Sequence, residues 1–153
     1  MKEWQIAEPQ KQVPAPESVS SEVKAVFGQG DASFVAAGGE EGIRQLVNDF
    51  YAEMSSLKQA EKIRAMHPAD LAVSIDKLSR FLCGWLGGPK RYSEKYGKIH
   101  IPVAHRHLAI GEAERDAWLA CMEKAIARQA YSEAFKSYLL KQLAVPAERC
   151  RNC

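Results

Sequence analysis

Apolar residues recur three and four positions apart along most of the chain, the spacing that gathers side chains on one face of an α-helix. One stretch predicts a helix over about 43–54. A second predicts a helix over about 70–82, with Pro68 and Asp70 as start signals and Gly87-Gly88-Pro89 as a stop signal. No segment alternates apolar and polar residues as a half-buried strand does. The pattern predicts an all-α fold, with these inward positions in the two helices: Ile43, Leu46, Val47, Phe50, Tyr51, Met54, Leu71, Ile75, Leu78 and Leu82.

Two further helices are predicted in the last third of the chain. Gly111 is followed by acidic residues that suit a helix N-terminus, and this helix is expected to run to about Gln129. Ser132 is placed to cap the next helix, which is expected to end before Pro146 because proline cannot donate a backbone hydrogen bond. Its expected inward residues are Phe135, Tyr138, Leu139 and Leu143.

The remaining segments are shorter or more polar. Residues 90–99 are polar and contain a glycine, so they predict a long loop, and a short segment over 102–109 carries histidines. Short helical pieces are predicted over 20–27 and over 31–37, the latter capped by Asp31.

Composition narrows the class of protein. The 153 residues carry a formal net charge of only +2, so a nucleic-acid partner is not indicated. No apolar run approaches the roughly 18 residues of a membrane span, and the first residues lack an export signal, so we expect a cytoplasmic protein without a membrane partner. Residues 1–30 read as an N-terminal extension, 31–146 as the folded domain and 147–153 as a tail.

The four cysteines fall into two groups. Cys83 and Cys121 lie inside apolar helical patterns and are expected to be buried as small hydrophobic side chains. Cys150 and Cys153 form a Cys-x-x-Cys pair in the tail, which supplies only two of the four ligands of a closed zinc site. A haem-free redox or adaptor protein using this pair is one alternative for the function.

Three histidines are candidates for an axial ligand to haem iron, a role that a neutral imidazole commonly fills. They are His100, His105 and His107. The last two are two positions apart, so on a helix they would point about 200° away from each other and only one could face the iron. Spacing alone leaves the choice open. Tyr51 and Trp118 lie on apolar helix faces, where plain core packing is the simpler interpretation.

Several motifs in one order resolve this choice. The run Gly87-Gly88-Pro89 is followed by Tyr92, then by a histidine segment, then by Glu-Arg-Asp-Ala-Trp at 114–118. From about Gly38 to about Ala130 the chain resembles the group II truncated haemoglobins. This resemblance implies a 2-over-2 helical sandwich around haem b.

The resemblance also implies roles for individual residues. The interval that precedes the Glu-Arg-Asp-Ala-Trp motif in the family places the iron ligand on His105. Tyr51, His67 and Trp118 fall on the distal positions that stabilise a bound ligand. The chain departs from the family just before His105, where Ile101-Pro102-Val103-Ala104 replaces the usual basic residues. The other expected haem contacts are Ser74, Leu78 and Phe81 in the pocket, Lys77 and Arg91 at the propionates, and Tyr92 in the loop over the haem edge.

The implied function is binding of dioxygen and related ligands, including nitric oxide, carbon monoxide, sulfide and peroxide. Dioxygen on iron carries partial negative charge, and three donors in a pocket of low dielectric would slow its release. Slow release suits retention or chemistry, so a nitric oxide dioxygenase or weak peroxidase with a separate reductase is the alternative. We expect a monomer or weak dimer, and ferric iron with water or hydroxide in the sixth position. Direct ligation by His67 is the rival arrangement.

Overall fold

The computed structural model describes residues 27–153, and all regular structure in this range is helical. The predicted all-α fold is confirmed. The helix expected over 20–27 lies almost wholly outside the described residues. Within them, no helix is long and apolar enough to cross a membrane. The elements are α2 (Ala32–Ala36), α3 (Gly39–Ser56), η1 (Lys58–Ala60), α4 (Glu61–Ala65), α5 (Ala72–Trp85), α6 (Arg91–Tyr96), α7 (Ile101–Ala104), α8 (Glu112–Ala127) and α9 (Glu133–Arg149).

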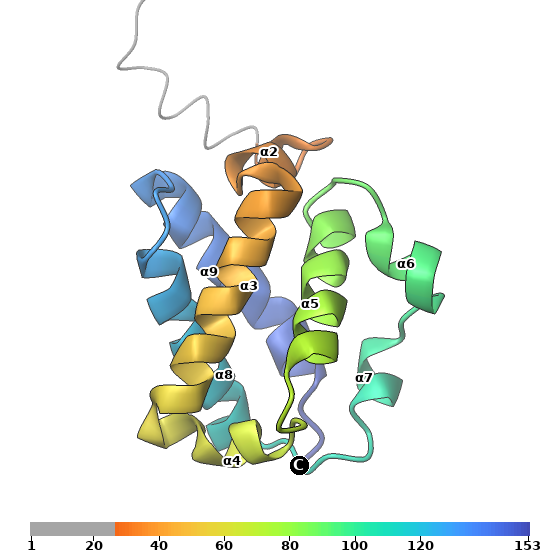
Figure 1. Cartoon of the computed structure of the whole chain (residues 1–153), viewed down its shortest axis with the longest axis vertical. Coiled ribbons are helices and arrows are strands. Elements are labelled where there is room, and N and C mark those ends of the chain that lie inside the picture. Colours follow the sequence, from red (N-terminus) through yellow and green to blue (C-terminus); the bar gives the residue numbers. More distant parts are fainter. Residues whose placement is uncertain (1–26) are drawn as a thin grey trace, which may run out of the picture.

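The four long helices form two packed pairs. Helix α3 packs on α5, α8 packs on α9, and the two pairs join mainly through contacts between α3 and α8. Figure 1 shows α3 and α5 side by side, with α9 crossing behind them. The short helices α6 and α7 lie on the far side of α5 from α3. This is the 2-over-2 sandwich that the sequence predicted.

Helix α3 is the centre of the core. All six of its predicted inward residues are buried, from Ile43 to Met54. Burial of each large apolar side chain stabilises the fold by about 1.5–3 kcal/mol. The side chains that surround them come from α8 and α9 and include Cys121, Met122, Phe135, Leu139 and Leu143. Tyr51 is therefore carried by the most rigidly packed helix of the domain.

Helix α5 is buried to a smaller extent. Its fully buried residues are Ser79, Leu82 and Cys83. Its apolar stripe is only half-buried and lies against the edge of the core, at Leu71, Ile75, Leu78, Phe81 and Trp85. Because α7 packs mainly against α9, it does not cover this stripe closely. Large apolar side chains left half-covered in this way indicate a binding surface.

The predicted loop over 90–99 and the predicted end of the last helix are wrong, and α5 runs past its last predicted inward residue to just before the predicted Gly87-Gly88-Pro89 stop signal. Residues 90–99 are not one loop, because Arg91–Tyr96 forms α6, which is held to α5 by charged and polar contacts instead of an apolar stripe. Helix α5 continues through Gly84 to Trp85. Helix α9 continues through Pro146 to Arg149. Pro146 and Ala147 are both buried, and this packing offsets the backbone hydrogen bond that proline cannot make.

The predicted caps have mixed outcomes. The Ser132 hydroxyl accepts a hydrogen bond from the Phe135 backbone N–H at 3.1 Å, so it caps α9 as expected. A Glu114 carboxylate oxygen accepts a bond from the Gly111 backbone N–H at 2.7 Å, which ties the start of α8. Asp31 precedes α2, but its side chain makes no capping bond.

Candidate functional site

The expected iron ligand, His105, lies directly after α7 and is half-buried. Its Nδ1 lies 2.8 Å from the Ile101 carbonyl oxygen. A carbonyl only accepts, so Nδ1 carries the proton and Nε2 carries a lone pair. Neutral imidazole with a free Nε2 is the form that binds a metal, and a carbonyl partner on the other nitrogen is the usual orienting contact.

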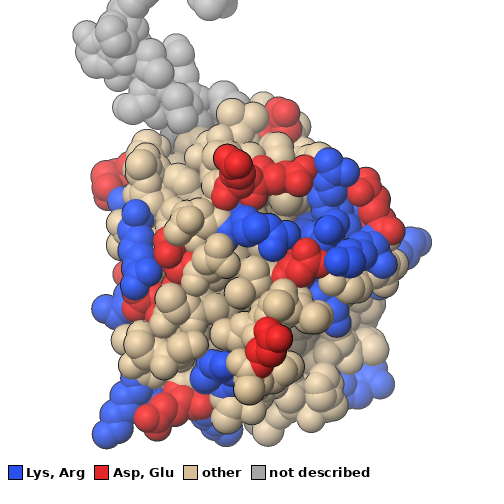
Figure 2. Space-filling view, viewed as in Figure 1, with Lys and Arg blue, Asp and Glu red and all other residues tan. Residues whose placement is uncertain are grey.

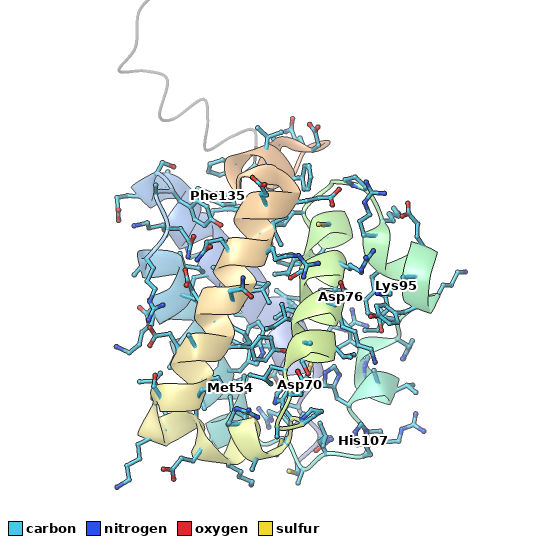
Figure 3. The ribbon with its side chains drawn as sticks, viewed as in Figure 1. Met54, Asp70, Asp76, Lys95, His107 and Phe135 are labelled. Atoms are coloured by element: carbon cyan, nitrogen blue, oxygen red, sulfur yellow. The ribbon has the colours of Figure 1, made fainter. Side chains whose placement is uncertain are left out.

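The other two candidate histidines lack this arrangement. His100 and His107 are both exposed, and Figure 3 shows His107 at the outer edge of the molecule near α7. Helix α7 ends at Ala104, so His105 and His107 do not share a helix and the 200° argument does not apply to them. Burial and the bond to Ile101 favour His105.

The three expected distal residues are brought together around Phe50. The Tyr51 and Trp118 rings lie 4.9 and 5.1 Å from the Phe50 ring, centroid to centroid, and the His67 ring lies 5.5 Å from that of Tyr51. Burial raises the pKa of Tyr51, so its hydroxyl keeps its proton and remains a donor. This hydroxyl makes no hydrogen bond to any other residue that the structure describes.

His67 is anchored in the same way as His105. Its Nδ1 lies 2.8 Å from the Ile63 carbonyl oxygen, which again leaves the lone pair on Nε2. Burial lowers its pKa, and the charges of Arg64 and His105 act in the same direction against the opposing bond to Ile63. The neutral form therefore presents an acceptor at Nε2, and donation from this atom requires a second proton. The influence of His105 also indicates that the two imidazoles lie within electrostatic reach.

A surface hollow of about 440 Å³ reaches His67. It lies beside the end of α3 and is lined by residues that include Leu57 and Arg64. Arg64 donates to the Pro68 and Ala69 carbonyl oxygens at 3.0 and 3.1 Å, which holds the loop that follows His67. The distal histidine is thus fixed between the end of α4 and this loop.

The expected lining residues of α5 lie along its half-covered stripe. Ser74, Leu78 and Phe81 are all half-buried. The Phe81 ring stacks on that of Trp85 at 6.4 Å, centroid to centroid. Trp85 is a part of this surface that the sequence analysis did not single out, because it lies past the predicted end of the helix.

The residues expected at the haem edge do not all converge. Lys77 and Tyr92 both approach the Tyr96 ring, with the Lys77 ammonium 5.3 Å from its centroid and the Tyr92 ring 5.1 Å from it. Lys77 makes no ion pair with a described residue. Arg91 instead pairs with Glu40 of α3 and with Glu94, at 3.0 and 3.2 Å.

Asp76 organises this edge and was not predicted. Its carboxylate accepts bonds from Arg44, Arg80, Lys95 and the Tyr96 hydroxyl at 2.7–3.1 Å. The Tyr96 hydroxyl and these cations hold the pKa of Asp76 well below its usual range. Figure 3 shows Asp76 and Lys95 close together, and Figure 2 shows basic and acidic side chains mixed over this part of the surface. Asp76 fixes α6, which carries Tyr92 and Tyr96, against α5.

Comparisons with known proteins bear on this arrangement. The family model for bacterial-like globins matches residues 32–152. Group 2 truncated hemoglobin YjbI of Bacillus subtilis (strain 168) is 31% identical over 114 residues, 74% of this chain and 84% of that protein. The chain belongs to the bacterial-like globin family.

Solved structures of related proteins agree with the assignment of this chain to the globins. A group II 2-on-2 hemoglobin from the plant pathogen Agrobacterium tumefaciens superposes with a TM-score of 0.74 at 35% identity, covering 78% of this chain and 93% of that one. A truncated oxygen-avid haemoglobin from Bacillus subtilis gives 0.71 at 31% identity, covering 78% and 98%. The expected membership of the truncated haemoglobins of group II is confirmed. The family match, over residues 32–152, also extends beyond the Gly38–Ala130 stretch that carries the resemblance and reaches into the C-terminal tail.

Membership in this family makes haem the cofactor of the globin, and the residues present fit that group. They offer the His105 imidazole with Nδ1 bound to a carbonyl and Nε2 free, a half-covered apolar stripe on α5 and an unpartnered hydroxyl on a buried tyrosine. Lys77 supplies a cation without a carboxylate partner among the described residues. The alternative of a haem-free protein is removed. Cys150 and Cys153 are both free thiols.

Proposed function

We propose that the globin retains dioxygen at a haem iron held by His105, and that Tyr51, Trp118 and His67 stabilise the bound ligand. One observation carries this proposal. The Tyr51 hydroxyl is a protonated donor on a buried residue, and it has no hydrogen-bond partner in the described part of the chain. The hydroxyl is not a buried atom left without a partner, since Ser79 Oγ is the side-chain atom of that kind among the described residues, so the Tyr51 hydroxyl stays accessible and can donate to a ligand.

The haem supplies an iron that binds dioxygen and other small ligands. The protein side chains then decide how long the ligand stays. The Tyr51 hydroxyl and the Trp118 indole N–H are neutral donors that flank Phe50, and both favour a ligand with negative charge. His67 adds a donor when its Nε2 is protonated. Hydrogen bonds in a pocket of low dielectric are stronger than in water, which favours slow release.

The same proposal assigns the contacts that hold the haem. Ser74, Leu78 and Phe81 would contact the macrocycle, and Tyr92 would lie over its edge. Lys77 is the first candidate for a propionate, because it has no competing carboxylate. Arg91 could serve the second propionate only by exchanging one of its bonds to Glu40 or Glu94.

Retention is tested by stopped-flow measurement of dioxygen release from the ferrous protein. The Bacillus subtilis relative described as oxygen-avid supports the expected result, which is slow release from this protein too. Replacing each donor should accelerate release. Rapid release from the unaltered protein would contradict the proposal, because the Tyr51 and Trp118 donors would then contribute nothing.

A second candidate function is oxidation of nitric oxide to nitrate by the oxygenated protein. The polar group of Tyr51, His67 and Trp118 favours it, because donors that retain dioxygen also stabilise negative charge formed during its chemistry. In a single turnover, rapid mixing of the oxygenated protein with nitric oxide should give one nitrate and one ferric haem per protein. Release of unreacted dioxygen and formation of a ferrous nitrosyl complex would favour simple binding. Repeated turnover would need a reductase as partner.

A further inference from the structure

The C-terminal tail folds back onto the segment that follows α7. The Asn152 side-chain oxygen accepts a bond from the Ile110 backbone N–H at 3.0 Å. Its Nδ2 donates to the Leu108 carbonyl at 2.6 Å and to the His105 carbonyl at 3.3 Å. The backbone N–H groups of Asn152 and Cys153 also donate to the Ile110 carbonyl, at 2.8 and 3.2 Å. One side chain thus bridges three backbone groups between His105 and Ile110.

This segment has few supports besides the tail. Helix α7 is a single turn, and it packs mainly against α9. Two of the segment's backbone bonds are short, from Ala104 N–H to the His100 carbonyl at 2.9 Å and from Leu108 N–H to the His105 carbonyl at 3.0 Å. The other two are long, from His105 N–H to the Pro102 carbonyl at 3.4 Å and from Arg106 N–H to the Val103 carbonyl at 3.3 Å. No regular element follows until α8 begins at Glu112. The bonds to Asn152 therefore add to the local backbone bonds in restraining the chain at His105, and they tie this segment to the tail.

The tail itself is fixed to the two helices beside it. Arg151 lies 3.6 Å from a Glu112 carboxylate oxygen at the start of α8 and 3.4 Å from Glu148 of α9. Glu148 in turn accepts from Arg115 at 2.6 Å. Figure 1 places the C-terminus between the start of α5 and the loop after α7. Asn152 is thus held against the histidine segment by neighbours on both sides.

We propose that Asn152 is a positioning residue for the iron ligand, an inference that rests on the proposed function of His105. The Ile101 carbonyl fixes the imidazole ring, and Asn152 fixes the backbone from which that ring projects. A metal–histidine bond depends on both, because groups beyond the ligand hold it in the geometry that the metal requires. The tail thereby contributes to the strength of the iron–histidine bond without contacting the haem.

The experiment compares the haem-loaded protein with Asn152→Ala and Asn152→Asp. Resonance Raman spectra of the ferrous, unliganded proteins report the iron–histidine stretching band, and transfer to apomyoglobin reports haem loss. We expect both variants to shift or broaden the band and to lose haem about tenfold faster, the lower end of the effect of groups that orient metal ligands. Aspartate keeps the acceptor for Ile110 but cannot donate, so its similarity to alanine would assign the effect to the two donor bonds.

Arg128→Ala is the matched control. Arg128 is an exposed side chain that also ties two elements, pairing with Asp49 and Glu53 of α3 at 3.2 and 2.6 Å, but it is not part of the haem site. The iron–histidine stretching band of Arg128→Ala should match that of the unaltered protein. Hydrogen exchange of the Ile110 amide should accelerate in Asn152→Ala alone, which supports the contact independently of haem.

The inference is overturned if the band and the rate of haem loss stay the same in Asn152→Ala, or if Arg128→Ala changes them equally. Its failure differs from failure of the proposed function. In the first case the unaltered protein still shows an iron–histidine band that disappears in His105→Ala. If the proposed function fails instead, the unaltered protein shows no iron–histidine band, or shows one that persists in His105→Ala.

Discussion

The two pocket histidines are held by the same local device, a bond from Nδ1 to the carbonyl oxygen four residues earlier. In His105 the partner is Ile101, and in His67 it is Ile63. Each histidine follows the end of a short helix, and the Ile63 carbonyl also accepts a backbone bond from the Met66 N–H at 3.1 Å. In both histidines the bond to the carbonyl selects one tautomer of the neutral ring. Both neutral rings present a lone pair at Nε2, which suits an iron ligand but not a hydrogen-bond donor.

Removing the hydroxyl of Tyr51 tests the distal network. Tyr51→Phe should speed dioxygen release by about tenfold, taking one retained hydrogen bond as about 1.5 kcal/mol. Trp118→Phe should act in the same direction, and the double variant should show less than the summed effect, because the two donors serve one ligand. Stopped-flow release rates provide the measurement.

Tyr131→Phe is the control for these variants. Tyr131 is also partly buried, but its hydroxyl donates to the Ala37 carbonyl at 3.3 Å, away from the pocket. The rate of dioxygen release from Tyr131→Phe should match that of the unaltered protein. Unchanged release in both Tyr51→Phe and Trp118→Phe would exclude the network.

The lowered pKa of His67 predicts the direction of a pH effect. A histidine with this shift is neutral near pH 7 and becomes a cationic donor only below its ordinary pKa of about 6.5. Fluoride binding to the ferric protein should therefore strengthen as the pH falls below this value, and the gain should be absent in His67→Phe. Optical titration at several pH values measures it. Identical titrations of the two proteins would show that His67 does not face the ligand.

Individual site residues could be predicted where a motif fixed their position. The family register supplied His105, Tyr51, His67 and Trp118, and the structure brings the last three together. It could not supply Asp76, because a single aspartate within a helix carries no local pattern. Its four partners come from 19 to 32 residues away or from one helical turn along. The same holds for Asn152, whose partners lie 42 to 47 residues earlier.

At the scale of elements, the long helices were predictable and the short ones were not. Helix α3 can be predicted from the sequence because six buried residues follow one helical pattern of apolar positions. Helix α6 contains no buried residue, so nothing in its hydrophobic pattern marks it. It is held by Asp76, Lys95 and Tyr96 instead. Elements that depend on distant polar partners are beyond prediction from periodicity.

Asp76 should make the stability of the α5–α6 unit depend on pH. Its folded pKa lies below the unfolded value of about 3.8, so its contribution is present above that pH and is lost as the pH falls towards the folded value. Asp76→Asn should lower the free energy of unfolding by about 1–3 kcal/mol at pH 7, because its bonds to charged groups are lost. Urea unfolding at pH 7 and at pH 3, below the unfolded pKa, measures the effect.

The difference between Asp76→Asn and the unaltered protein should shrink at the lower pH. Glu123→Gln serves as the control, since Glu123 is an exposed carboxylate of α8. Its unfolding free energy should stay close to that of the unaltered protein. A difference for Asp76→Asn that is the same at both pH values would contradict the assigned role of the carboxylate charge.

At the scale of the whole molecule, the two sides of the proposed haem pocket are built differently. The distal side rests on α3, which is packed into the core on both α5 and α8. The proximal side rests on a one-turn helix, a loop and the C-terminal tail. The 2-over-2 arrangement could be predicted because the apolar spacing and turn residues indicated four long helices, and the family resemblance implied how these helices pack. The tail's return to His105 did not, because it depends on α9 continuing through Pro146.

The central claim is that haem is held through His105, and optical spectra of three reconstituted proteins test it most directly. The unaltered protein should show a Soret band that shifts on reduction and again on binding carbon monoxide. His107→Ala should reproduce these spectra. His105→Ala should lose stable haem uptake, with recovery only on addition of imidazole, because the vacant axial position then accepts a free ligand. Loss of haem in His107→Ala with full retention in His105→Ala would contradict the account.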